Sequence, residues 1–277
     1  MKITEYPQIT SLADDNVFVI DGPEGTKHIK AEDVPFALMD VANVVMHRSI
    51  FRGKNLGTSV TTEQKTAIQN GTFTDLWLGD YWVINGVNWR IADFDYWYYT
   101  GDTSFTNHHL VIIPDTSLYS AKMNDTSTTS GGYTGSAMYT TNLTNAKSTI
   151  NSAFGDAVLN HRDYLINAVT SGYPSAGAWT NSTVELPNEM MIFGAMIYTP
   201  AGNGTTVVKR YTTARTQLAL FNVAPQFIHT TTTGQRISYW LRDVVSDSLF
   251  VRVAEYGSST ETAASLEYGV RPVFPIG

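Results

Sequence analysis

The stretch YWLRDV (residues 239–244), followed by LFVRVAEYG (249–257) and YGVRPVFPI (268–276), decides the fold that this sequence predicts. Each segment is rich in the aromatic and β-branched residues that favour strands, and polar turns separate them. An apolar last segment would be a liability if it were loose, so we expect it to be an inward-facing strand of the core. Arg242 and Arg271 then need carboxylate or carbonyl partners, because an unpaired buried charge costs several kcal/mol. The alternative is that both side chains reach the surface.

The composition indicates a β-rich protein with long polar loops. Of the 277 residues, 43% are hydrophobic, which is enough to bury a sizeable core. Charged residues make up only 16%, against about 25% in an average globular domain, and Thr, Ser, Asn and Gly take their place. The length suits one large domain, or one domain with a smaller appendage.

Charge and hydropathy argue against several classes of partner. The net charge is −7 and no stretch is basic, so we expect no nucleic-acid partner. No segment approaches the ~20 apolar residues of a membrane span, and the opening MKITEYPQIT lacks the apolar run of a signal peptide. The chain has no cysteine, which excludes disulfides, thiolate metal sites and a cysteine nucleophile. We expect no cofactor.

Three regions differ in texture. Residues 1–33 predict an arm with a β-hairpin, in which NVFVID and TKHIK are the strands and GPEG is the turn. Residues 34–50 predict a short helix, and residues 51–277 predict the body. The helix carries apolar residues with the four–three–four spacing of a short coiled coil, which would join copies of the chain: Val34, Leu38, Val41 and Val45. The alternative is an amphipathic helix that lies on its own domain.

The body predicts an α+β layout, a twisted antiparallel sheet flanked by two helices with long polar loops. The Asn85-Gly86 pair marks a β-hairpin among aromatic residues. Apolar spacing and turn residues predict helices near residues 62–70, 142–154 and 187–193. Residues 108–115 read as a buried strand and 119–142 as a long polar loop, and strands and loops then alternate from QLALFNVAPQFI (217–228) onward.

The closing segments resemble the C-terminal signature of C-type-lectin-like domains, which bacteriophage tropism proteins share with formylglycine-generating-type enzymes. In those domains a Trp-Leu-Arg strand and a middle strand precede a terminal Gly-x-Arg-Pro-Val strand. The matching residues are Trp240, Leu241, Arg242, Gly269, Arg271, Pro272 and Val273. The resemblance implies a C-type-lectin-like body whose two ends lie side by side in the sheet, with structural roles for Trp240, Arg242, Arg271 and Pro272.

Upstream segments point to a phage particle. GTFTDLWLGDYW, HHLVIIPDTSLYSAKMN, GGYTGSAMY and VELPNEMMIFG are similar to segments of virion proteins of phages that infect Gram-positive gut bacteria. The opening ITEYPQITSLADDNVFVIDGPEGTKHIKAEDV resembles the leading segment of phage fibre and spike proteins, which attaches them to the particle. The resemblance implies a virion protein with no defined biochemical activity.

The residues do not predict an enzyme. Formylglycine-generating relatives act through cysteines, which are absent here. Asp93 and Asp95 alternate onto one face of a strand and suggest a hydrolytic pair, although this spacing is commoner in turns and surfaces. His108 and His109 would point to opposite faces of a strand, so we expect one packed, one exposed and no metal. Glu185, Asn188 and Glu189 precede a helix and are expected to cap it rather than to bind calcium.

Aromatic residues are the best candidates for ligand contact. If DYWYY (95–99) is extended, Tyr96 and Tyr98 lie on one side and Trp97 and Tyr99 on the other. One pair belongs to the core, and the other either meets a carbohydrate or protein ligand or is buried between subunits. The candidate ligand-binding residues are Tyr98, Tyr99, Tyr133, Tyr139, Trp179 and Tyr256. Tyr beside Ser, Gly and Asn is typical of recognition loops, and also of polar loops without a ligand.

Together these observations predict a homotrimeric virion surface protein. Residues 1–33 would bind other virion proteins, and loops of the body would bind a host cell-surface glycan or protein with an avidity that grows with copy number. The alternative is a purely structural head-fibre, decoration or baseplate subunit whose aromatic residues face neighbouring virion proteins.

Overall fold

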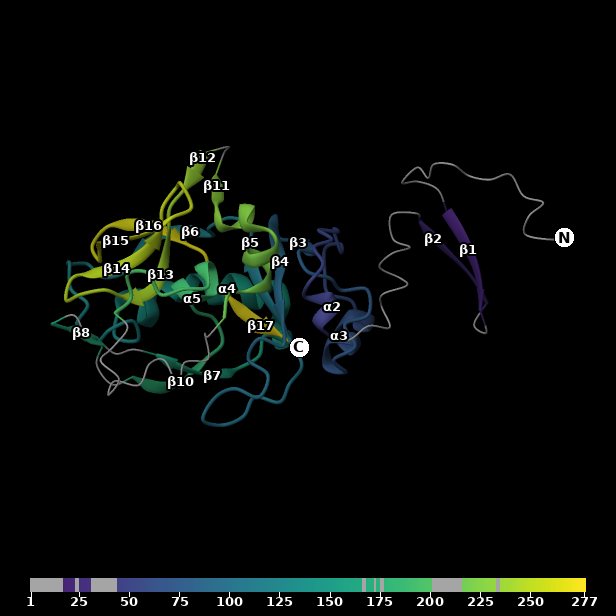
Figure 1. Cartoon of the computed structure of the whole chain (residues 1–277), viewed down its shortest axis with the longest axis horizontal. Coiled ribbons are helices and arrows are strands. Elements are labelled where there is room, and N and C mark those ends of the chain that lie inside the picture. The colour runs from purple at the N-terminus through teal and green to yellow at the C-terminus, as the bar shows by residue number, and fades with distance from the viewer. Residues whose placement is uncertain are drawn as a thin grey trace.

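The computed structural model describes residues 17–22, 25–30, 44–165, 168–171, 173–174, 177–200, 216–232 and 235–277. Figure 1 shows their elements in chain order. The strands are β1 (Val17–Gly22), β2 (Gly25–Lys30), β3 (Tyr81–Ile84), β4 (Val87–Phe94), β5 (Leu110–Pro114), β6 (Tyr119–Lys122), β7 (His161–Leu165), β8 (Val169–Thr170), β9 (Tyr173–Pro174), β10 (Ala178–Ser182), β11 (Thr230–Thr232), β12 (Gln235–Ile237), β13 (Tyr239–Val244), β14 (Leu249–Val253), β15 (Ser259–Ala263), β16 (Glu267–Val270) and β17 (Phe274–Ile276). The helices are α2 (Val44–His47), α3 (Thr62–Gln69), α4 (Leu143–Phe154), α5 (Glu189–Phe193) and α7 (Ala219–Val223), with single turns η3 (Met138–Asn142), η4 (Gly155–Ala157) and η5 (Pro225–Ile228).

The fold is mixed α+β, with mostly antiparallel sheets and few helices. One sheet has the order β17-β5-β4-β3, and β3 and β4 form the predicted hairpin, with positive φ at both Asn85 and Gly86. A second sheet has the order β15-β14-β13-β16-β6, in which β13 and β16 are parallel. The hairpin predicted in the N-terminal arm is β1 with β2, and its register runs from Val17↔Lys30 to Gly22↔Gly25.

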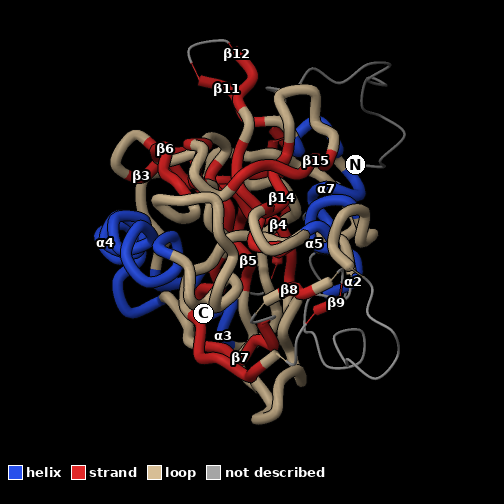
Figure 2. The backbone as a smooth tube through the Cα atoms, turned by 90° about the vertical axis from the view of Figure 1, so that its left-hand side faces the viewer, coloured by secondary structure: helices blue, strands red, loops and turns tan. Residues whose placement is uncertain are grey.

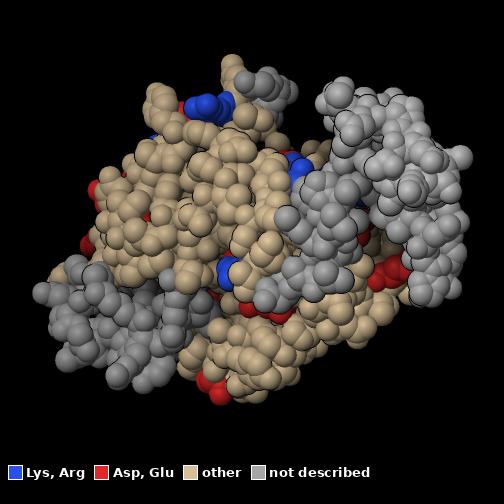
Figure 3. Space-filling model, turned by 45° about the vertical axis from the view of Figure 1, so that its right-hand side comes forward, with Lys and Arg blue, Asp and Glu red and all other residues tan. Residues whose placement is uncertain are grey.

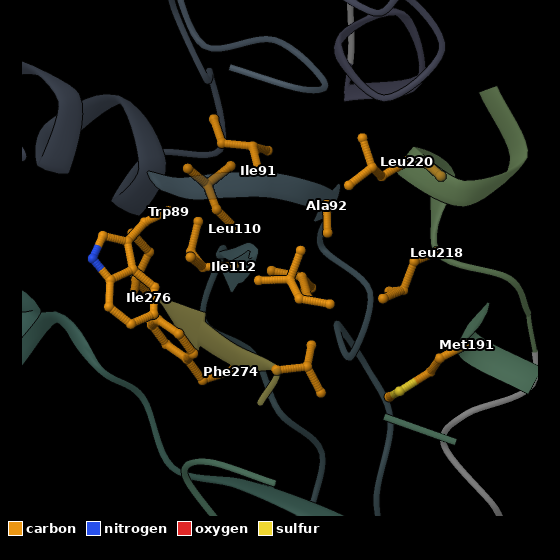
Figure 4. Close-up of a cluster of buried hydrophobic side chains, with 14 of the residues drawn as sticks. Trp89, Ile91, Ala92, Leu110, Ile112, Met191, Leu218, Leu220, Phe274 and Ile276 are labelled. Atoms are coloured by element: carbon orange, nitrogen blue, oxygen red, sulfur yellow. The ribbon is translucent and has the colours of Figure 1, made fainter. Parts of the chain in front are cut away.

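Side chains of β13 enter two apolar clusters on opposite faces of the five-stranded sheet. Tyr239 and Leu241 belong to a large cluster shared with the four-stranded sheet, and Trp240 and Val244 belong to a smaller one. In the large cluster, Trp89 packs edge-on against Phe274, with ring centroids 5.7 Å apart (Figure 4). α4 contributes to both clusters, because its buried face spans three turns.

The closing stretch forms two strands rather than one. β16 lies in the five-stranded sheet and β17 in the four-stranded sheet, with Arg271–Val273 as the corner between them. Proline has no N–H to donate to a ladder, so Pro272 suits the corner. β17 is buried and pairs with β5, so the last strand belongs to the core as predicted.

The two ends of the body do not lie side by side, and this expectation is wrong. The first segment of the body forms bridges at the β3 edge, Asn55↔Tyr81 in β3 and Phe51↔Leu78 just before it, whereas β17 occupies the other edge. Strands β5, β4 and β3 therefore separate the two ends, because the Asn85-Gly86 hairpin inserts two neighbouring strands between them.

The predicted helices in the body are present. α3 begins with a capping box in which Thr61 accepts from the Gln64 N–H while the Gln64 side chain accepts from the Thr61 N–H. α5 begins at the Asn188 cap and ends at Gly194 in the left-handed conformation. Residues 217–228 form α7 and η5 instead of the expected strand, since a short apolar run fits either structure.

Of the helix predicted over residues 34–50, the structure describes only α2 (Figure 1). His47 in α2 is buried, and its Nδ1 lies 2.8 Å from the Leu76 carbonyl oxygen. The packed body therefore already includes residue 47. Within the described ranges, no helix is both long and apolar enough to cross a bilayer.

Candidate functional site

An open pocket of about 500 Å³ lies where the end of α3, residues 156–159 and the last residue of the chain meet. Figure 2 shows α3 and the C-terminus at the same end of the body. Polar groups dominate its lining: Gln69, Thr106, Asn107, His108 and Asp156, with Leu159 and Gly277 completing the wall. This volume falls within the range of about 300–1,000 Å³ that is usual for ligand pockets.

His108 is held in this pocket by Asp95. The His108 Nδ1 lies 2.7 Å from Asp95 Oδ2, while Asp95 Oδ1 accepts from the His109 N–H at 2.9 Å. A carboxylate only accepts, so Nδ1 of His108 donates to Asp95. The His108 side chain is 30% exposed, so solvent reaches this ring. The pair thus fixes the position of an imidazole in the pocket wall.

A tight turn places Tyr98 beside His108 and Tyr99 beside Tyr98. The expectation of an extended DYWYY segment is wrong, because β4 ends at Phe94 and both Asp95 and Tyr99 have positive φ, 51° and 54°. Tyr98 stacks on His108, with ring centroids 4.5 Å apart, and Tyr99 is 68% exposed. Non-glycine residues with positive φ persist only where their surroundings hold them, and they cluster at functional sites.

The other two aromatic residues of this turn point inward. Trp97 is buried, and the Tyr96 hydroxyl donates to the Thr216 carbonyl oxygen at 2.7 Å. Burial raises the pKa of Tyr96, so this phenol stays protonated and remains a donor. Tyr98 and Tyr99 are therefore the pair that the turn offers to a ligand.

His109, next in sequence to His108, is a core residue. It is buried, its Nε2 accepts from the Trp97 N–H at 3.1 Å, and its Nδ1 donates to the Asn107 carbonyl oxygen at 3.0 Å. Burial lowers the pKa of His109 to about 4, so the ring is neutral at physiological pH. The two histidines differ as predicted, one packed and the other partly exposed.

A buried polar centre joins β7, β13 and residue 185. The Arg242 guanidinium contacts Asp163 Oδ2 at 2.7 Å and also contacts Glu185, whose Oε1 lies 3.3 Å from His161 Nε2. His161, Asp163 and Glu185 could in principle ligate a metal ion, since their ligand atoms lie within 4.8 Å of one another. They do not fit one well, because Arg242 already supplies the positive charge to both carboxylates.

Burial lowers the pKa of His161 to about 4. The imidazole is therefore neutral at pH 7 and leaves compensation of the carboxylates to Arg242. We interpret this cluster as a structural ion network of the core. Glu185 belongs to this network rather than to a helix cap, so that expectation is wrong, while Asn188 caps α5 as expected.

Glu189 is the centre of a second buried network and does not cap the helix through its side chain. Its carboxylate accepts from the N–H groups of residues 197–199 at 2.9–3.1 Å and from the hydroxyls of Thr199 and Ser259. Asp243 lies beside it and accepts from the Glu189 N–H at 2.7 Å. Burial and the charge of Glu189 raise the pKa of Asp243 to about 7.

Asp93 and Asp95 do not form a catalytic pair. Asp93 is buried, and its carboxylate accepts hydrogen bonds from Nε and Nη2 of Arg48, both at 2.9 Å, whereas Asp95 binds His108. β4 ends at Phe94 and Asp95 has a φ of 51°, so the strand alternation that would have placed both carboxylates on one face stops between them.

The remaining candidate ligand residues are dispersed. Tyr133 is buried, and its hydroxyl oxygen accepts from the Leu186 N–H at 2.9 Å, so it is a core residue. Tyr139 packs edge-on against Tyr133 and is half-buried, as is Trp179 in β10. Tyr256 is 78% exposed in the loop between β14 and β15. Of the six candidates, Tyr98 stacks on a residue of the pocket wall, and Tyr99 packs against Tyr98.

The residues with predicted structural roles are buried, namely Trp240, Arg242, Arg271 and Pro272. The Arg271 side chain donates to the carbonyl oxygens of Pro114 and Phe227, both at 2.9 Å, so the expected carbonyl partners are present. Of the predicted oligomer seam, Val34, Leu38 and Val41 lie outside the described residues. Val45 is 56% exposed on α2.

Sequence reasoning missed most of the pocket. Gln69, Asn107 and Asp156 come from three separate segments, and no sequence motif predicts that they lie close together. The aromatic run at 95–99 was the one sequence pattern that pointed to this region, and it did not identify the residues that line the pocket. Comparison with protein-family models, with curated proteins and with solved structures finds no match for this chain.

Proposed function

We propose that this chain is a bacteriophage virion surface protein whose body contacts the host cell surface. Residues 1–33 attach it to the particle, residues 34–50 join three copies, and the body is a C-type-lectin-like domain. The proposal rests on the resemblance of the closing strands and of the upstream segments, described above.

The observation that carries the adhesive part of the proposal is the pocket with the Tyr98–Tyr99 turn beside it. It combines an open polar hollow with an exposed aromatic ring, which is the surface a binding protein needs. Charged side chains form only small, separate groups on the face in Figure 3, which favours polar and aromatic contacts over attraction by bulk charge.

The arrangement supports binding rather than catalysis. The carboxylates of Asp93, Asp163, Glu185 and Glu189 are buried and already hold arginines, N–H groups or hydroxyls. A glycosidase needs two carboxylates that flank a substrate, whereas Asp156 is the one acidic residue among the described residues that line the pocket.

The test is binding of the fluorescently labelled full chain to a panel of Gram-positive gut bacteria. Saturable binding at micromolar protein or below is expected, and absence of binding to every strain would contradict the adhesive role. In parallel, antibody labelling of phage particles should place the protein on the virion surface. Surface labelling without cell binding would favour the structural alternative, a head-fibre, decoration or baseplate subunit.

A further inference from the structure

We propose that the pocket binds an uncharged sugar residue through hydrogen bonds with Gln69, Asn107 and His108. This inference rests on the proposed adhesive function and names the class of ligand at its site. It starts from the chemistry of the pocket wall, which offers amide, hydroxyl and imidazole groups.

The first argument is charge. Of the described residues that line the pocket, none is Lys or Arg, and Asp156 is a carboxylate. The other ionisable group, His108, is held by a second carboxylate, that of Asp95. An anionic ligand would therefore face the Asp156 carboxylate, with no Lys or Arg among these lining residues to pair with it. A cationic ligand would gain little from the pocket, because its one partner among the described lining residues would be the exposed Asp156 carboxylate, whose charge solvent screens.

The second argument is the balance of donors and acceptors. Each side-chain amide presents both donors and an acceptor, and the contact of His108 Nδ1 with Asp95 leaves Nε2 as the second polar atom of the ring. Vicinal hydroxyls of a sugar ring also donate and accept, so they match such a wall. Gln69, Asn107 and Asp156 are exposed, so their polar groups are accessible to a ligand rather than committed to the core.

The third argument is the aromatic turn. Tyr98 stacks on His108 at an interplanar angle of 17°, which fixes the plane of the imidazole, and Tyr99 leaves its ring open to solvent. The apolar face of a sugar can pack against such a ring. Leu159 adds an apolar surface within the wall.

The experiment is saturation-transfer NMR with the full chain and the methyl glycosides of glucose, galactose, mannose, rhamnose, N-acetylglucosamine and N-acetylgalactosamine. Glucuronic acid and glucosamine serve as the anionic and cationic probes. We expect transfer to at least one neutral glycoside, a dissociation constant on the order of 1 mM and no loss of binding at high salt, because no ion pair is involved. The charged probes should bind more weakly.

Variants locate the site. Gln69→Ala with Asn107→Ala should weaken binding about tenfold or more, as expected for two lost hydrogen bonds. Asn70→Ala removes an exposed amide adjacent to Gln69 but outside the pocket lining and should leave binding unchanged. All these side chains are exposed, so the variants should fold.

Three results would overturn the inference: no transfer to any neutral glycoside, stronger binding of a charged probe, or unchanged binding in the double variant. The cell-binding assay separates this failure from failure of the proposed function. If the double variant still binds bacteria like the native chain, the protein is an adhesin that uses another surface.

Discussion

Thr199 has one hydroxyl proton, yet its Oγ1 lies 2.7 Å from Glu189 Oε2 and 2.9 Å from Asp243 Oδ1. One hydroxyl cannot donate to both carboxylates. The contacts are satisfied together when Asp243 is protonated and donates to Thr199, which in turn donates to Glu189. The raised pKa of Asp243, about 7, agrees with this arrangement: burial is the main cause, the charge of Glu189 adds to it, and Arg242 opposes it.

Because Asp243 holds a proton in the folded state, the free energy of unfolding should depend on pH. The folded pKa of about 7 lies above the ordinary value of 3.8, so the folded state holds a proton that the unfolded state has released. This contribution is complete below about pH 4 and is lost as the pH rises through 7. Asp243→Asn mimics the protonated acid, and its amide can donate to Thr199.

We therefore expect Asp243→Asn to match the native chain below about pH 4 and to become increasingly more stable than it as the pH rises to 8. The difference should be about 1 kcal/mol or more, since each unit of pKa shift is worth about 1.4 kcal/mol. Thermal melts of both chains from pH 5 to 8 measure this difference, since each kcal/mol shifts the melting temperature by roughly 2–4 °C. A constant difference across this range would contradict the shared proton.

Arg242 provides the second prediction. Arg242→Met leaves Asp163 and Glu185 buried without their cation, so the free energy of unfolding should fall by about 3–5 kcal/mol. Adding Glu185→Gln removes one of the two uncompensated charges and should recover part of the loss. Urea denaturation of the single and double variants measures both effects, and a double variant no more stable than the single one would show that charge is not the cause.

At the scale of elements, the end of α3 sets the position of the pocket wall. The helix stops at Gly71, which has a φ of 67°, and a Cβ added there would lie 2.6 Å from Nε2 of His108. Gly86 in the β3–β4 turn has a similar φ of 77°, but a Cβ there would meet nothing within 4 Å. These two glycines therefore share the same backbone strain and differ in their neighbours.

Gly71 and Gly86 allow a matched test of whether His108 contacts the ligand. Gly71→Ala and Gly86→Ala should each destabilise the chain by about 1 kcal/mol, the cost of a non-glycine residue in the left-handed region. Only Gly71→Ala should also displace the His108 ring and reduce sugar binding. Equal effects of both variants on binding would argue that His108 does not contact the ligand.

The same elements show what sequence could predict. Residues that act locally were informative: the Asn85-Gly86 turn, the Gly194 stop and the spacing of α4 each placed an element correctly. Contacts between distant segments were not predictable. The corner at Arg271–Val273, the bulge in β4 and the meeting of α3 with residues 156–159 depend on tertiary packing, which leaves no local pattern.

At the scale of the whole molecule, the predicted trimer depends on α2 and the residues before it. His47 packs into the body, while Val45, two residues earlier, is 56% exposed. Val45 continues the spacing of Val34, Leu38 and Val41, which a coiled coil would bury between chains.

Light scattering of the full chain should give a mass three times that of the monomer. Val45→Asp with Leu38→Asp should lower it toward the monomer, because a charge in the seam is costly to bury. Thr62→Asp, a surface substitution on α3, is the matched control and should leave the mass unchanged. A monomeric native chain would contradict the coiled coil.

Gly277 forms part of the pocket wall. A Cβ atom added to it would lie 2.7 Å from both the His108 carbonyl oxygen and a Leu159 methyl group. Any polypeptide joined to this residue emerges directly at the mouth of the hollow. An affinity tag or fluorescent fusion placed there would crowd the ligand and could mask binding altogether. Expression plasmids for these assays should therefore carry such additions ahead of Met1.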